Sequence, residues 1–193
     1  MESGTTGVPA CWLLVAEAVG RAALELLLEF GKLKEITPKG TLEPLQMEVA
    51  LRWVLWELDA SAAEKELNIS VDVAEGLPPV RLGADQAKSV WTNLLSNAIK
   101  YTPQGGKVQV RLSQEGEMLR GEVQDSGIGI PQEAQAKLFS EFYRAPNARE
   151  LNIPGTGLGL AIVRQIIESA GGEIGVESQE GQGATFTFTL PAV

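Results

Sequence analysis

Apolar residues in the first forty positions recur at the spacing of a helix. Between residues 8 and 36 they step alternately by four and three, as in a coiled coil or a helical bundle. The positions in this seam are Trp12, Ala16, Val19, Ala23, Leu26, Phe30 and Leu33. Pro38 and Gly40 then end the predicted helix. Such a seam must pack against a partner. We expect this partner to be either the chain's own domain or another helix, and the persistent heptad step favours another helix. That helix would come from an upstream segment or from a second copy of this chain, forming a homodimer.

The rest of the chain alternates between helical and strand-like patterns. Apolar residues at helical spacing predict helices over residues 47–67, 84–101, 132–138 and 156–170. Alternating apolar residues predict strands over residues 69–73, 108–112, 119–123, 174–176 and 185–190. Turn residues join the second strand to the third and the fourth to the fifth as hairpins, and residues 140–154 form a loop without periodicity. These elements predict an α+β fold, a two-layer sandwich with one sheet covered by helices on one face.

Composition excludes several functional classes. The 193 residues carry a formal net charge of −9, so we expect no nucleic-acid partner. The absence of histidine excludes Ser-His-Asp and Cys-His catalysis and imidazole metal sites, and the single cysteine, Cys11, excludes a disulfide framework. No apolar run is long enough to span a membrane and no export signal is visible, so we expect a cytoplasmic chain, although the parent protein could be membrane-anchored. The four tryptophans are expected in the core or at helix interfaces.

Two amides and an ammonium share one face of the helix predicted over residues 84–101. Asn93, Asn97 and Lys100 are spaced four and three residues apart. Amide oxygens are hard ligands that suit a hydrated Mg²⁺, and a lysine suits phosphate. A polar helix face is equally typical of plain solvent exposure, so this segment alone does not distinguish a site.

Three glycine-rich segments follow. Asp125-Ser126-Gly127-Ile128-Gly129-Ile130 comes straight after a strand, where the carboxylate can accept a hydrogen bond from an exocyclic amine and the glycines let the backbone approach a flat ligand. Gly155-Thr156-Gly157-Leu158-Gly159-Leu160 leads into a helix, whose first N–H groups bind phosphate readily. The third segment, residues 181–186, is G-Q-G-A-T-F. Each segment alone is also typical of an ordinary turn.

The order of these segments is specific. Together with the stretch Leu138-Phe139-Ser140-Glu141-Phe142-Tyr143-Arg144, they resemble the N, G1, F, G2 and G3 boxes of the ATP-binding catalytic domain of sensor histidine kinases. The resemblance covers about residues 41–193. It implies a Bergerat-type sandwich with a mixed, mainly antiparallel sheet, binding ATP and Mg²⁺ beneath a mobile lid. Residues 1–40 would then be the second helix of a dimerisation and phosphoacceptor domain.

The resemblance also implies a role for each matching residue. Asn97 would be the Mg²⁺ ligand with Asn93 in support, Lys100 and Arg144 would contact phosphate, and Tyr101 would pack against the nucleotide. Asp125 would bind the adenine amino group, and Thr185 would lie near the base. The residues that would admit and line the adenine are Gly127, Gly129 and Ile130. One further segment would form the hinge of the lid and the start of the helix that faces the phosphates. Its residues are Gly155, Thr156, Gly157, Leu158, Gly159 and Leu160.

One departure from the family leaves alternatives open. The family's phosphoacceptor is a histidine, and this chain has none. One explanation is that the chain is part of a longer kinase that has a cognate response regulator as its partner. The other is that the chain has lost the acceptor and is a regulatory nucleotide-binding module without phosphotransfer. A gyrase-like or chaperone-like ATPase is disfavoured, because those relatives carry a glutamate base where this chain has Asn93.

Overall fold

The computed structural model describes residues 43–151 and 153–193, and the helix predicted over residues 8–36 lies outside them. The helices are α2 (Met47–Glu64), α3 (Ala84–Tyr101), α4 (Gln132–Gln135), α5 (Pro146–Glu150) and α6 (Gly159–Ser169). The strands are β1 (Pro44–Leu45), β2 (Asn68–Val73), β3 (Val80–Arg81), β4 (Lys107–Glu115), β5 (Met118–Asp125), β6 (Glu173–Ser178) and β7 (Ala184–Pro191).

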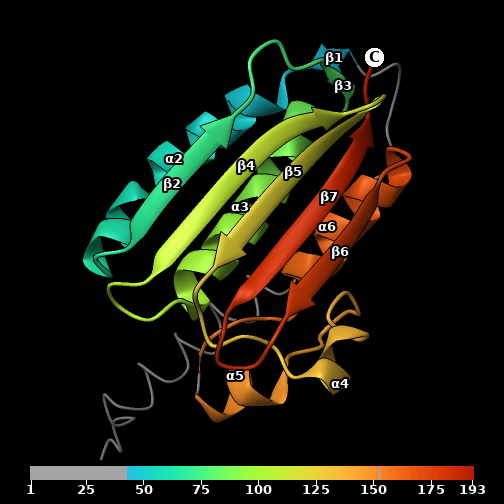
Figure 1. Ribbon diagram of the computed structural model, residues 1–193. Helices are drawn as coiled ribbons and strands as arrows, with labels where there is room; N and C mark the ends of the chain where they lie inside the picture. Colours follow the sequence, from blue (N-terminus) through green and yellow to red (C-terminus); the bar gives the residue numbers. More distant parts are fainter. Residues whose placement is uncertain (1–42, 152) are drawn as a thin grey trace, which may run out of the picture. The chain divides into compact units, whose positions relative to one another are not determined.

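Five strands form one mixed sheet in the order β2-β4-β5-β7-β6 (Figure 1). The β2–β4 pair is parallel, and the three other pairs are antiparallel. Both predicted hairpins are present, as β4–β5 and β6–β7. Strands β1 and β3 pair separately in a small two-stranded sheet that the sequence pattern did not predict. The predicted α+β fold class, with a mixed, mainly antiparallel sheet, is therefore confirmed.

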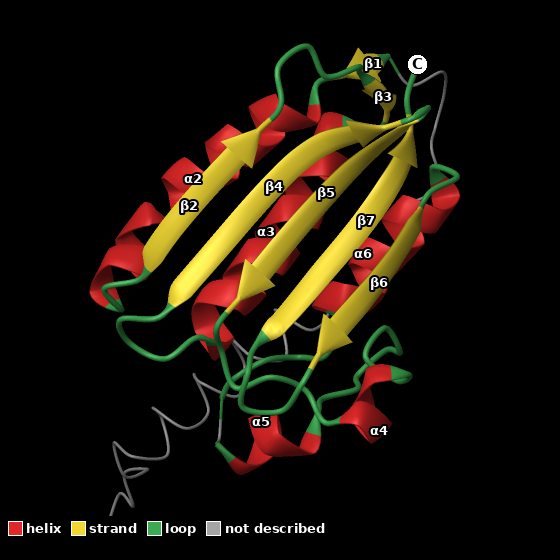
Figure 2. Ribbon diagram, viewed as in Figure 1, coloured by secondary structure: helices red, strands yellow, loops and turns green. Residues whose placement is uncertain are grey.

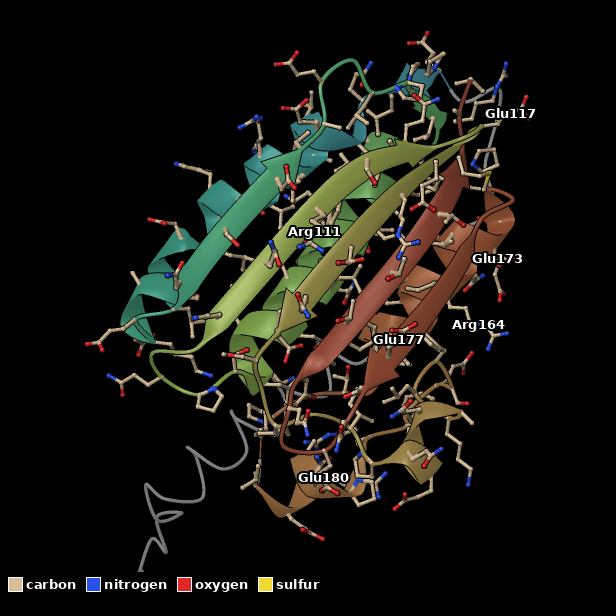
Figure 3. The ribbon with its side chains drawn as sticks, in the orientation of Figure 1. Arg111, Glu117, Arg164, Glu173, Glu177 and Glu180 are labelled. Atoms are coloured by element: carbon tan, nitrogen blue, oxygen red, sulfur yellow. The ribbon has the colours of Figure 1, made fainter. Side chains whose placement is uncertain are left out.

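Helices α2, α3 and α6 cover one face of this sheet (Figure 2). Along β4, β5 and β7 the residues that point toward these helices alternate and are buried, as Val108, Val110 and Leu112 show in β4. The opposite face is polar and uncovered in the described structure, with Arg111 and Glu177 among its side chains (Figure 3). The sequence alternation therefore reports a sheet with one buried face and one hydrated face.

The core is centred on Trp91 of α3. Its ring packs edge-on against Phe188 of β7, with centroids 5.1 Å apart, and its Nε1 donates to the carbonyl of Met47. The sequence predicted Trp53 and Trp56 in the core or at a helix interface. Trp53 lies at the edge of the contact between α2 and α3 and is 41% exposed, whereas Trp56 is 75% exposed. They lie on α2 away from its buried residues, and the Lys88 ammonium covers the Trp53 ring at 3.1 Å.

Several element boundaries differ from the prediction. The helix predicted over residues 156–170 begins only at Gly159, because Gly157 has a φ of +79°, which an α-helix does not accommodate. The loop predicted over residues 140–154 contains the short helix α5, which starts at Pro146. Helices α2 and α4 end three residues earlier than predicted, at Glu64 and Gln135. None of the helices in the described part of the chain is both long and apolar enough to cross a membrane.

Candidate functional site

The polar face of α3 forms one wall of the site. The side-chain amide of Asn93 is oriented by its Nδ2, which donates to the carbonyl of Ser89 at 2.8 Å and leaves the Oδ1 oxygen outward. Asn97 and Lys100 follow on the same face, one and two turns further along. The helix therefore presents amide oxygens and an ammonium group in line.

The glycine loop, residues 154–159, lies directly against this face. A Cβ atom added at Gly159 would be 2.5 Å from the Oδ1 of Asn93, and one added at Gly155 would be 2.7 Å from the Nζ of Lys100. The first helical hydrogen bond of α6 is donated by Ile162 to Leu158, so the N–H groups of the preceding turn have no acceptor within the helix. The structure thus brings the start of α6, where a helix favours anions, beside the lysine and the amides.

Asp125 lies at the end of β5 and is only 8% exposed. Its Oδ1 accepts a hydrogen bond from the backbone N–H of Gly127 at 2.8 Å. Burial raises the pKa of Asp125 above its ordinary value of 3.8, while the backbone N–H groups of Gly127 and Ala184 act in the opposite direction. A desolvated carboxylate with so few donors has free acceptor capacity for a ligand amine.

The raised pKa of Asp125 predicts a measurable titration. Between pH 3.8 and that raised value, the folded chain holds one more proton at this site than the unfolded chain. The contribution of Asp125 to stability is therefore largest at low pH and falls as pH rises through this window. Carboxyl-carbon NMR should show Asp125 titrating above 3.8. Titration of Asp125 at or below 3.8 would contradict the expected desolvation.

The loop after Asp125 is fixed on two sides. The N–H of Ile128 donates to the carbonyl of Tyr101 at the end of α3, and the carbonyl of Ile128 accepts from Gly181 in the β6–β7 turn. A side chain at Gly129, which has a φ of +63°, would meet the carbonyl of Gln179 at 2.0 Å. Only glycine therefore lets this loop pass between α3 and the β6–β7 turn.

Helices α4 and α5 lie over the same end of the sheet (Figure 1). Gln135 of α4 donates to the carbonyls of Ile130 and Ser178, and Asn147 of α5 donates to the carbonyl of Gly129. A small apolar cluster includes residues of both helices. Its buried members are Ala134, Leu138, Ala145 and Ala148, and its partly buried members are Tyr101, Ile128, Ile130, Phe139, Tyr143, Leu160 and Val176. Apolar residues from two of the glycine-rich segments, from the stretch 138–144, from β6 and from α3 thus meet in one place.

Arg144 joins this cluster from the segment between α4 and α5. Its Nη2 donates to the carbonyl of Ile153, and within the described residues its buried Nε has no hydrogen-bond partner. Burial raises the pKa of Tyr101, and the positive charge of Arg144 acts against that rise. Arg144 therefore lies close to Tyr101 at the end of α3 and brings its positive charge there.

The structure places Thr185 apart from the other predicted site residues. In the β5–β7 register Asp125 pairs with Ala184, so Ala184 shares the face of Asp125 and Thr185 points to the opposite face. Ala184 is buried beside the carboxylate, and the preceding Gly183 would clash with the carbonyl of Asp125 at 1.9 Å if it carried a Cβ. Sequence reasoning missed Ala184, although the alternation along β7 contained the signal.

The residues present fit a magnesium ion better than a transition metal. Among the described residues there is no group of three histidine, cysteine, aspartate or glutamate side chains that could hold a metal. Amide oxygens on α3 remain as donors, and Mg²⁺ is commonly bound through few protein ligands together with waters and substrate phosphates. Asn97, with Asn93 beside it, would hold such an ion.

Comparison with known proteins identifies the class. Residues 83–193 match the family model described as histidine kinase-, DNA gyrase B- and HSP90-like ATPases. The match covers more than half of the chain and includes all the site segments described above. The chain belongs to this ATPase family.

The curated relatives within this family are sensor histidine kinases. The chain is 45% identical over 114 residues to sensor histidine kinase WalK of Bacillus subtilis, covering 58% of this chain and 19% of WalK. It is 37% identical over 175 residues to sensor histidine kinase AruS of Pseudomonas aeruginosa, covering 88% of this chain and 17% of AruS. The chain thus spans about a fifth of the length of these relatives.

Solved structures agree with this placement. Full-length ShkA, crystallised in complex with AMPPNP, matches 99% of this chain and 40% of its own, with a TM-score of 0.79 and 27% identity. The mycobacterial sensor histidine kinase MprB matches 78% of this chain and 97% of its own, with a TM-score of 0.67 and 28% identity. The resemblance to histidine kinase catalytic domains inferred from the sequence is therefore confirmed.

Proposed function

We propose that this chain is the ATP-binding catalytic part of a sensor histidine kinase. It binds Mg-ATP and donates the γ-phosphoryl group to a histidine that the chain itself does not carry, in two-component signalling with a response regulator. The observation that carries this proposal is the approach of the glycine loop to α3, where Gly159 and Gly155 leave room for Asn93 and Lys100. The family match and the sensor-kinase relatives support it.

Each part of the nucleotide has a complementary group in this site. The Asp125 carboxylate accepts a hydrogen bond from the exocyclic amine of adenine, and the partly buried apolar cluster contacts the faces of the base. The phosphates lie at the start of α6, where backbone N–H groups and the helix dipole favour anions. Lys100 and Arg144 add positive charge close to them.

Phosphoryl transfer needs positioning and charge neutralisation more than protein-borne chemistry. In the reaction, the bond between the γ-phosphorus and the bridging oxygen of ADP breaks, and a bond to an imidazole nitrogen of the acceptor histidine forms. Mg²⁺, when bound, neutralises charge on the phosphate oxygens. Asn97 and Asn93 would hold that ion, Lys100 and Arg144 stabilise the charge that shifts to ADP, and α4 and α5 limit the access of water.

Transfer to a separate acceptor tests the proposal. The chain is incubated with γ-labelled ATP, Mg²⁺ and a purified phosphoacceptor domain from one of the related sensor kinases. We expect acid-labile, base-stable label on the acceptor and none on this chain, because the chain contains no histidine. An acceptor variant that lacks its histidine is the matched control.

The same experiment separates the alternatives. Because none of the 193 residues is histidine, a regulatory nucleotide-binding module without phosphotransfer is the second candidate. ATP binding without label on any of several acceptors would favour that module. Steady ATP hydrolysis without an acceptor would instead favour an ATPase of the gyrase or chaperone kind.

A further inference from the structure

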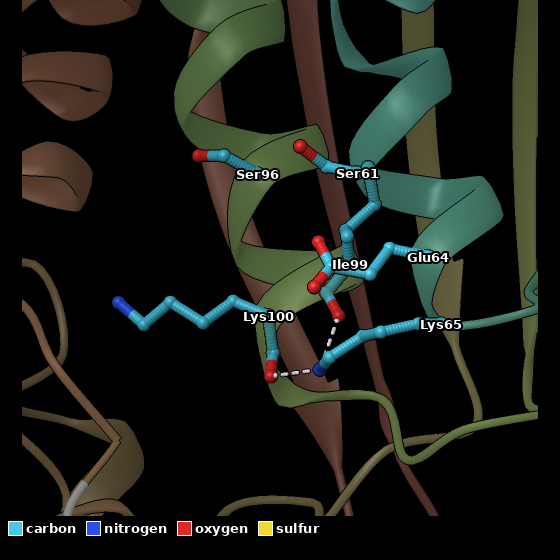
Figure 4. A pocket seen from close by; sticks show the side chains of 6 residues that line it. All are labelled: Ser61, Glu64, Lys65, Ser96, Ile99 and Lys100. Atoms are coloured by element: carbon cyan, nitrogen blue, oxygen red, sulfur yellow. Dashed lines mark hydrogen bonds between the residues drawn. The ribbon is translucent and has the colours of Figure 1, made fainter.

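Lys65, just beyond the end of α2, binds the end of a different helix. Its ammonium donates three hydrogen bonds, to the carbonyls of Ile99 at 2.9 Å, Lys100 at 2.8 Å and Thr102 at 2.9 Å. Figure 4 shows the first two of these bonds, and it shows the Lys100 side chain extending away from Lys65. All three donors of this ammonium are therefore used by backbone at the end of α3.

The carbonyls at the end of α3 are fully paired as a result. The Ala98 carbonyl accepts from the N–H and the hydroxyl of Thr102. The next two carbonyls and that of Thr102 accept from Lys65, and that of Tyr101 accepts from Ile128. The final turn of α3 is thus fixed between Lys65 and the loop that follows Asp125.

The charge of Lys65 matters as much as its hydrogen bonds. The C-terminus of a helix carries a partial negative charge, equivalent to about half an electron. Lys100 lies in this last turn, where the negative end of α3 would oppose a polyphosphate. An ammonium bonded directly to these carbonyls offsets that negative charge.

We propose that Lys65 is a positioning residue for the phosphate half of the nucleotide site. It fixes the last turn of α3, so that the Lys100 side chain faces the glycine loop, and it neutralises the helix end near the bound phosphates. This inference rests on the proposed function, because it assumes that the anion is the phosphate chain of ATP. Lys65 touches no part of the nucleotide itself and acts through Lys100 and the α3 carbonyls.

Removing Lys65 should leave the domain folded. The residue borders a cleft of about 420 Å³ between α2 and α3, lined also by Ser61, Glu64, Ser96, Ile99 and Lys100. Water entering this cleft can solvate the carbonyls that lose the ammonium. The packed faces of α2 and α3 do not depend on this side chain.

The test compares Lys65→Met with Lys65→Arg in binding ATP and adenosine. The Met variant should bind Mg-ATP about 10-fold more weakly, which is the scale of a charge at a helix end, and adenosine with unchanged affinity. Arginine keeps the charge and several donors, so it should restore most of the ATP affinity. Lys107→Met removes an exposed lysine elsewhere and is the matched charge control. Calorimetry measures ATP binding, and NMR titration measures the weaker adenosine.

Each outcome gives a distinct answer. An unchanged ratio of the ATP and adenosine affinities in Lys65→Met would overturn the positioning role. Failure of Lys65→Arg to restore ATP binding would overturn it as well. Absence of ATP binding by the wild-type chain would instead contradict the proposed function. If the Met variant fails to fold, Lys65→Gln, which keeps a donor without the charge, takes its place under the same criteria. In the Lys65→Met chain, the amide hydrogen of Ile128, which is bonded to the last turn of α3, should exchange faster with solvent even when no nucleotide is present.

Discussion

Replacing Asp125 with asparagine is expected to lower the affinity for ATP by about 10- to 100-fold. A hydrogen bond that involves a charged group contributes about 1.5–3 kcal/mol, and burial removes the competing water. The side-chain NH2 of asparagine can also face the exocyclic amine of adenine, so that two donors meet. The loss of affinity is therefore larger than the loss from replacing the carboxylate with a neutral acceptor. Calorimetry with Mg-ATP and Mg-GTP measures the effect, and selectivity for ATP over GTP should fall as well, because guanine offers an oxygen that the new amide can bind.

The exposed residue Asp72 provides the control for this substitution. Asp72→Asn removes the same charge from the polar face of β2 and should leave ATP affinity within about 2-fold, as expected for a distant surface charge in physiological salt. Equal ATP affinity in the wild-type chain and in Asp125→Asn would remove Asp125 from the adenine site. It would also leave the burial of that carboxylate without a functional explanation.

Replacing Asn97 with alanine is expected to lower phosphoryl transfer to a supplied acceptor by about 100-fold or more. Loss of a ligand that orients Mg²⁺ costs several kcal/mol of charge stabilisation, and about 2.7 kcal/mol already corresponds to 100-fold. Alanine is the best helix former, so the substitution should not unfold α3. Transfer rates at saturating ATP, measured across a range of Mg²⁺ concentrations, separate metal binding from nucleotide binding.

A matched asparagine is available for comparison. Asn68 is exposed at the start of β2, and Asn68→Ala should change neither the transfer rate nor its Mg²⁺ dependence. Adenosine binding should survive in Asn97→Ala, because the groups proposed to bind adenine, the Asp125 carboxylate and the apolar cluster, do not include Asn97. A variant at Asn97 that transfers phosphoryl groups at the wild-type rate would assign the metal to another ligand.

The sequence predicts best where local signals agree. Helix α3 runs over the predicted residues 84–101, because its apolar spacing is regular and Thr102-Pro103 ends it. The hairpins β4–β5 and β6–β7 likewise follow from alternation and turn residues. The roles of the candidate site residues came from the resemblance to sensor histidine kinases and stay predictions, while the approach of Gly159 to Asn93 shows why glycine is needed at that position.

Long-range contacts explain what the sequence did not predict. Strands β1 and β3 contain two residues each and depend on long-range pairing, with one another and, at Val80, with Ala192. Helix α5 is held by the hydrogen bond from Asn147 to Gly129, which no local periodicity reports. The three bonds of Lys65 join residues 34 to 37 positions apart, so its role becomes visible only in the folded chain.

The parallel pair β2–β4 has a consequence for how this domain forms. Hairpins close over a few residues, but β2 and β4 pair through a register that joins Asn68 to Lys107, with the whole of α3 between them. Closing that long loop costs chain entropy before any strand contact repays it. Strand β2 should therefore join a sheet that the two hairpins have already begun. Lys65 lies in the turn that leads from α2 into β2, and its ammonium bonds the end of α3. The pairing of β2 and the ordering of the end of α3 should therefore occur together.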